Sequence, residues 1–281
     1  MIITTGDMNF FLIQLTFREA FSRKVFHAFF IVSTLAGLTL LFLLSLNIVR
    51  DLGTLSFISG GRPQDPDSLR KLVRGIQGGV AVALFTVGLF MSLFATGNLI
   101  PEMLRAGKID LLISKPLSRN RLLLGRILGA VAVVAFNVFY LVIFFWLILS
   151  VRTGFWNWGF LLAGLMVVLT YIALYSLMVL LSILFKSGAV SLMGTFLIIF
   201  LAPVLMQRNR LYLLLSADSR ITRNLIDAFY YFFPKPGDLA VITQKLARGA
   251  PVESWTPLWS SLLFSVVIIL LSSLIFRRKS F

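Results

Sequence analysis

Long apolar runs alternate with short polar segments along the chain, and this alternation predicts the fold. Each run is about twenty residues long with few charges, which suits an α-helix crossing the ~30 Å hydrocarbon core of a bilayer. Six runs qualify as spans, at approximately residues 25–49, 76–98, 125–150, 159–185, 188–206 and 257–276. The pattern therefore predicts an all-α integral membrane protein with six transmembrane helices, organised as a single transmembrane domain over residues 1–281.

The polar segments between the spans have patterns of their own. Residues 8–24 place three phenylalanines on one helical face and end in charged residues, which predicts an N-terminal amphipathic helix in the membrane interface. Residues 50–74 contain several glycines and prolines and predict a loop. Residues 221–232 and 239–246 predict two short amphipathic helices between the fifth and sixth spans. Both a surface-lying and a re-entrant arrangement of these helices agree with the pattern.

One polar segment, between the second and third spans, is unlike a lipid-facing helix. It is bounded by Pro101 and Pro116 and encloses a short amphipathic run from Glu102 to Ile113. A proline suits the first turn of a helix, and the residue before a proline tends to leave one. Glu102 is then expected in a first turn, where the helix dipole favours an anion. Because the run is too short and too charged to cross a bilayer, it predicts a surface helix at approximately residues 102–113 that offers side chains to a partner.

Composition agrees with a membrane protein. The chain is 58% hydrophobic with a mean hydropathy of +0.94, and a soluble domain of this length could not bury so much apolar surface. The net charge of +15 comes from basic residues in the polar segments, where they lie next to anionic lipid headgroups. We therefore expect membrane lipid, and no nucleic acid, as a partner.

The sequence lacks the residue clusters of enzymes and of proton-coupled carriers. We find no acid or base in the middle of a span, as such carriers need. We also find no nucleophile with its base, no paired carboxylates and no phosphate-binding loop. The chain has no cysteine, and one histidine, His27, cannot form a metal cluster alone. We expect no enzymatic activity, no catalytic residue, no metal and no cofactor bound by this chain.

The distribution of basic and aromatic residues bears on topology. Six spans place both termini on one side, and the two sides carry equal numbers of lysine and arginine. The density of these residues in 105–126 and at the C-terminus favours cytoplasmic termini. In this arrangement all five tryptophans fall near the opposite interface, as an aromatic belt should. They are Trp146, Trp156, Trp158, Trp255 and Trp259.

The segment between the second and third spans also carries several spaced elements. In chain order these are Glu102, Gly107-x-Ile109-Asp110-Leu111-Leu112, Ser114-Lys115-Pro116-Leu117-Ser118-Arg119 and Leu124-Gly125-Arg126. Together with the layout of the spans, this pattern resembles the permease subunits of type-2 ATP-binding-cassette (ABC) exporters of bacteria. A stand-alone channel or carrier, and a membrane scaffold that recruits a soluble partner, stay open as alternatives.

The resemblance implies a mechanism, partners and a location. In such permeases this segment is the coupling helix, which rests in a cleft of a separate ATPase subunit. ATP binding closes two ATPases, and the coupling helices move with them and rock the spans between inward- and outward-facing states. ATP and Mg would be bound by the partner ATPase, and a second permease subunit, identical or homologous, would complete the pathway. The implied location is the bacterial cytoplasmic (inner) membrane.

By position, the resemblance assigns ATPase coupling to a set of residues within this segment. They are Glu102, Arg105, Gly107, Lys108, Asp110, Pro116, Ser118 and Arg119. Separately, glycines spaced four residues apart predict faces for close helix packing, although such spacing also arises by chance in spans rich in small residues. These are Gly75 and Gly79 in the second span and Gly125 and Gly129 in the third.

Overall fold

A computed structural model of the chain describes residues 30, 31, 34, 35, 38, 39, 66–104, 119–207 and 227–278. Within these residues every regular element is a helix, and five helical segments are long and apolar enough to cross a membrane. The predicted all-α membrane fold is thereby confirmed. Most of the first predicted span and the whole N-terminal interfacial helix lie outside the described residues, so the count of six spans stays a prediction.

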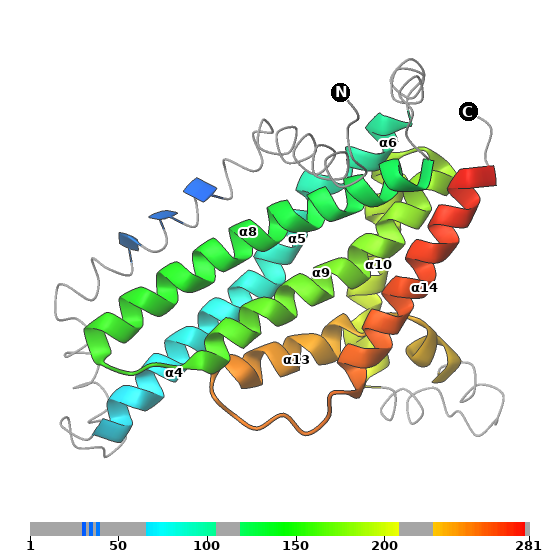
Figure 1. The fold of residues 1–281 in the computed structure, drawn as a ribbon. Coiled ribbons are helices and arrows are strands. Elements are labelled where there is room, and N and C mark those ends of the chain that lie inside the picture. Colours follow the sequence, from blue (N-terminus) through cyan, green and yellow to red (C-terminus); the bar gives the residue numbers. More distant parts are fainter. Residues whose placement is uncertain are drawn as a thin grey trace.

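The second span is a rod of consecutive helices (Figure 1). It consists of α4 (Pro66–Ala83), the π-helical η2 (Leu84–Gly88), α5 (Leu89–Thr96) and, after a two-residue turn, α6 (Leu99–Met103). Its start at Pro66 corrects the predicted loop, which extended to residue 74. Proline lacks the N–H that a first helical turn leaves unsatisfied anyway, and the charged residues that follow extend the helix beyond its apolar part.

The remaining spans are α8 (Arg119–Thr153), α9 (Trp158–Phe185), α10 (Gly188–Met206) and α14 (Thr256–Arg278). Helix α9 is the centre of the bundle and contacts α8, α10, α14 and the second span. Figure 1 shows it between α8 on one side and α14 on the other. Because its residues are apolar on every face, it suits a position surrounded by other helices.

The short outer helices complete the bundle. Of the predicted helix at residues 221–232 the structure describes 227–232, which are helical, and the second predicted helix corresponds to α13, which spans Pro236–Ala247. Helix α13 packs against α9, α4 and α10. A Cβ atom added at Gly237 would lie 3.4 Å from the carbonyl oxygen of Ala202 in α10. At its other end, the carbonyl of Leu246 lies against Gly159 in the first turn of α9.

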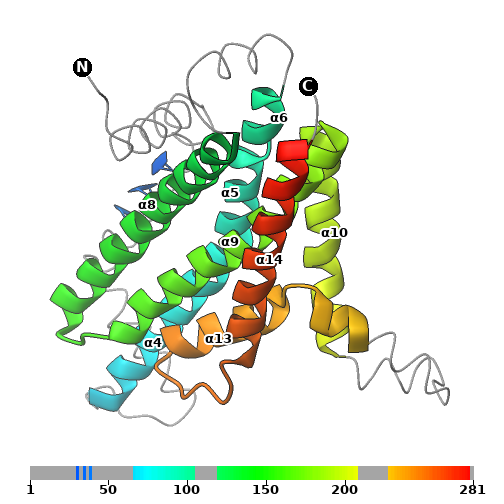
Figure 2. The ribbon, with the colours of Figure 1, turned by 45° about the vertical axis from the view of Figure 1, so that its right-hand side comes forward.

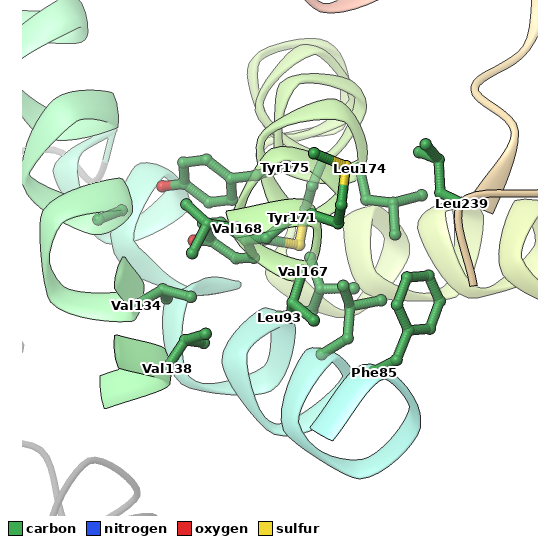
Figure 3. Close-up of a cluster of buried hydrophobic side chains, with 14 of the residues drawn as sticks. Phe85, Leu93, Val134, Val138, Val167, Val168, Tyr171, Leu174, Tyr175 and Leu239 are labelled. Atoms are coloured by element: carbon green, nitrogen blue, oxygen red, sulfur yellow. The ribbon is translucent and has the colours of Figure 1, made fainter. Parts of the chain in front are cut away.

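Figures 1 and 2 distinguish two ends of the bundle. At one, here called the α6 end, lie α6, the start of α8, the α9–α10 connection and the C-terminal end of α14. At the other, here called the tryptophan end, lie the start of α4, the α8–α9 turn, α13 and the start of α14. The two ends are joined by a continuous apolar core around α9. Figure 3 shows α9 side chains, among them Tyr171 and Leu174, packed between residues of η2, α5, α8 and α13.

A part of the first predicted span is also described. Residues Phe30 and Thr34 are helical and lie against Tyr140 of α8. The rings of Phe30 and Tyr140 stack with centroids 4.3 Å apart, and the hydroxyls of Thr34 and Tyr140 are 3.1 Å apart. This segment therefore packs along α8, on the side of the bundle away from α14 (Figure 2).

Candidate functional site

The candidate site begins where the second span turns into the polar segment. Helix α5 ends at Thr96, Gly97 and Asn98 form a turn, and α6 follows. The backbone N–H of Glu102 donates to the carbonyl of Asn98 at 3.0 Å, which closes the first turn of α6. Pro101 is tolerated there because a first turn needs no N–H from it. Glu102 thus lies in a first turn, and the helix starts at Leu99, before the predicted residue 102.

Helix α6 is anchored in the bundle rather than laid on its surface. Leu99, Ile100 and Met103 are each 1% exposed, and Pro101 is also buried. These side chains pack against α9 and α8. Glu102 is the residue of α6 that stays partly exposed. The described start of the polar segment is therefore held by apolar packing and leaves the Glu102 side chain partly exposed.

The turn before α6 also contacts the start of α10. A Cβ atom on Gly97 would lie 2.9 Å from Cδ1 of Leu192, and one on Gly188 would collide with the side-chain amide of Asn98. Real Cβ atoms avoid such distances, so both positions suit glycine. The close approach joins the turn before α6 to the start of α10.

Hydrogen bonds between hydroxyl groups fasten the same end of the bundle. Ser182 near the end of α9 donates to Ser191 of α10 at 3.0 Å, and the Ser191 hydroxyl donates to the carbonyl of Ser187 at 2.7 Å. Deeper in the core, the Tyr171 hydroxyl donates to Thr96 at 2.9 Å, immediately before the turn that leads to α6. Because these groups are buried, each bond lost leaves a polar atom without water.

The structure describes the predicted coupling residues only in part. Glu102 is described as above, and Arg119 is the first residue of α8, with its side chain outside the description. The others lie outside the described residues, namely Arg105, Gly107, Lys108, Asp110, Pro116 and Ser118. Their coupling role stays a prediction.

The predicted packing glycines fall in two different environments. Gly125 and Gly129 are buried in α8. A Cβ atom on Gly75 or Gly79 would meet no atom within 4 Å, so neither lies against another described helix of this chain. The close approaches occur instead at glycines that the four-residue spacing does not mark, such as Gly97 in a turn.

A second feature, which the sequence did not indicate, lies at the tryptophan end. The Asn157 side-chain amide donates to Gln77 of α4 at 2.6 Å and to the carbonyl of Ala247 of α13 at 2.8 Å. Its oxygen accepts from the N–H of Gly159 and caps α9. The indole N–H of Trp146 in α8 donates to the Asn157 carbonyl at 3.0 Å. One buried residue thus holds four helices together.

This network could not be read from spacing. An asparagine before Trp158 is a recognisable N-cap signal, but its partners are 80 and 90 residues away in the chain. We call Asn157 and its partners the Asn157 clamp. In the part of the chain that the structure describes, no group of three or more His, Cys, Asp or Glu side chains is placed to hold a metal ion.

Comparisons with known proteins point to one family. The model of a family described as "ABC-2 family transporter protein" matches residues 14–281, nearly the whole chain. A search of curated proteins found no match. The family match includes all the described residues, and with them the α6 anchor and the Asn157 clamp.

Proposed function

Because the chain belongs to the ABC-2 family of transporter proteins, we propose that it is driven by ATP hydrolysis in a separate ATPase subunit, through the segment that begins at Glu102. Membership makes the chain a permease component of an ABC transporter. The proposal adds the direction of transport, which is export, and the means of coupling. It also places the α6 end and both termini in the cytoplasm, with the protein in the bacterial inner membrane.

The observation that carries the proposal is the burial of α6. A helix that only rested on the membrane could move without disturbing the spans. Here Leu99, Ile100 and Met103 are buried and pack against α8 and α9. Interiors are close-packed and do not absorb displacements locally. A push on the segment after Glu102 therefore moves α6 as a body, and the contact of Gly97 with Leu192 passes the movement to α10.

The π-helix in the second span supports a hinge between the two ends. π-Helical turns are rare and occur frequently at functional sites, and η2 lies between the α6 anchor and the Asn157 clamp. Thr86 in η2 donates to the carbonyl of Val82 at 2.8 Å. We place the hinge at Leu84–Gly88, with α4 held by the clamp and α5–α6 moving together with the parts of α8 and α9 against which they pack.

A second permease subunit, identical or homologous, belongs to the proposal. Helix α10 turns most of its large apolar side chains outwards, including Met193, Leu197 and Phe200. Such a face suits lipid or another subunit. Since one subunit supplies only the spans described above, two would enclose the transport pathway between them.

The experiment is a pull-down of the tagged chain from native membranes in mild detergent, with partners identified by mass. We expect a phosphate-loop ATPase in near-equal amount, and its loss when residues 102–110 are scrambled. A matched control scrambles residues 250–256 at the tryptophan end, which are exposed or half-buried, and keeps the ATPase. If the inserted protein brings down no ATPase, the proposal fails and a channel, carrier or scaffold takes its place.

A further inference from the structure

Arginine side chains from different helices gather at the tryptophan end of the bundle. The Arg74 guanidinium lies over the Phe155 ring, with Cζ 5.5 Å from the ring centroid, and the Arg70 guanidinium lies over the same ring at 5.9 Å. Phe155 belongs to the α8–α9 turn, so α4 and this turn meet there. Stacking on an aromatic face positions a guanidinium and leaves its N–H edge available to an acceptor.

Arg248, at the end of α13, joins this group from a third element. Gly78 of α4 is buried beneath it, because a Cβ atom there would lie 2.6 Å from Nε of Arg248. Gly249 takes a positive φ of 65°, and a Cβ atom on it would lie 3.5 Å from Nε of Arg74. Two glycines therefore let Arg74 and Arg248 approach each other's backbone. Figure 1 shows the start of α4 beside the C-terminal end of α13.

Two acids of α13 and the loop that follows it, Asp238 and Glu253, are engaged elsewhere. Lys245 donates to Glu253 at 2.7 Å, and this hydrogen bond and the ammonium charge lower the pKa of the Glu253 carboxyl. Asp238, at the far end of α13, accepts from the Tyr230 hydroxyl at 3.0 Å. Within the described residues, neither Arg74 nor Arg248 has an ion pair.

An unmatched donor lies beside the arginines. Gln77, nearly one turn along α4 from Arg74, is fully buried, and its Nε2 has no acceptor among the described residues. Its oxygen is already taken by Asn157. Among the side chains that the structure describes, hydrogen-bond donors and positive charge therefore exceed the acceptors around Arg74, Arg248 and Gln77.

The height of the group in the membrane indicates what the acceptor is. Trp158 is 65% exposed and Trp259 is 69% exposed, both at this end of the bundle. Exposed tryptophans of membrane proteins lie at the level of the lipid headgroups. Further along the same rod, Val82 and Val87 are exposed and offer an apolar surface to acyl chains. An anion at this level, above an apolar helix face, is a phospholipid phosphate.

We propose that Arg74 and Arg248, with Arg70 beside them, form a binding site for the headgroup phosphate of an anionic phospholipid. Two guanidinium groups can hold phosphate oxygens through paired, charge-assisted hydrogen bonds. In the topology of the proposed function this site is on the side away from the ATPase, where the positive-inside rule disfavours arginine. The phosphate of a bound lipid would neutralise the charges of these arginines on that side. It would also connect α4, the α8–α9 turn and α13.

The test measures lipid binding by the purified full-length chain and needs neither transport nor an ATPase, so it fails or succeeds independently of the proposed function. Short-chain phosphatidylglycerol is titrated into protein in neutral detergent, and binding is followed by thermal stabilisation and by native mass spectrometry. The double variant R74Q/R248Q is compared with K71Q/R152Q. The control removes the same charge from exposed residues at the same end.

We expect R74Q/R248Q to bind phosphatidylglycerol about tenfold more weakly or worse, since hydrogen bonds to charged groups are the strong ones. The control should bind like the unmodified chain. If both variants bind phosphatidylglycerol equally weakly, the loss comes from the reduced net charge alone, and the proposed site is wrong. Competition by inorganic phosphate at equal concentration would assign the site to free phosphate instead of lipid. If the double variant cannot be purified, the single variants R74Q and R248Q are measured instead. Each is expected to bind phosphatidylglycerol several-fold more weakly than the unmodified chain.

Discussion

The Asn157 clamp allows a prediction whose size follows from the contacts. In Asn157→Ala the cap of α9 is lost, which costs about 1 kcal/mol. The acceptors on Gln77 and Ala247 are left buried without a donor, which costs about 1 kcal/mol or more each. The total is about 3 kcal/mol. For a chain of this size that corresponds to a fall of about 6–12 °C in melting temperature.

The matched control is Asn137→Ala. Asn137 is as buried as Asn157, at 5% against 8% exposed, but its amide donates only to Val133 in its own helix. Removing it separates no helices, and we expect a fall in melting temperature of about 2–4 °C, from one bond of about 1 kcal/mol. Both variants are compared by thermal unfolding of the purified protein in one detergent. If the two variants lose equal stability, burial alone explains the effect and the bonds of Asn157 between helices contribute nothing extra.

Three further predictions follow from single contacts. Gly159→Ala forces a Cβ atom against a backbone carbonyl of α13 and should cost about 1–3 kcal/mol in thermal unfolding. Tyr171→Phe removes the donor to Thr96 and should cost about 1 kcal/mol in the same assay, without loss of insertion. The Lys245 partner lowers the pKa of Glu253, so the pair stabilises the fold at neutral pH and is lost as pH falls through that lowered pKa. The stability difference between the unmodified chain and Glu253→Gln should therefore shrink on acidification.

The sequence predicted well those elements that are determined by residues adjacent in the chain. Helix α9 is an uninterrupted apolar run, and its structure matches the predicted span within one residue at its start. The two-residue connection at Lys186 and Ser187 was also predicted, and it folds because Lys186 adopts a left-handed conformation and Ser187 caps α10. In both cases neighbouring residues determine the structure.

The features that the sequence did not predict depend on residues far apart in the chain. The amide of Asn157 meets Gln77 only because α4 and α9 cross at the tryptophan end. Gly188 matters because Asn98 lies against it, and no periodicity marks either position. The start of α4 at Pro66 was missed because its charged first turns resemble a loop in composition.

In the proposed mechanism ATP moves α5 and α6 relative to the tryptophan end, and the distance between two spin labels reports this movement. Because the chain has no native cysteine, spin labels can be placed at single introduced cysteines. One pair joins Phe94 of α5 to Arg152 of α8, both exposed, and a control pair joins Lys71 to Arg152, both at the tryptophan end. In the assembled transporter we expect ATP to change the first distance and leave the second unchanged. If ATP leaves both distances unchanged in a complex that hydrolyses it, α5 and α6 do not move relative to the tryptophan end, and ATP is not coupled through α6.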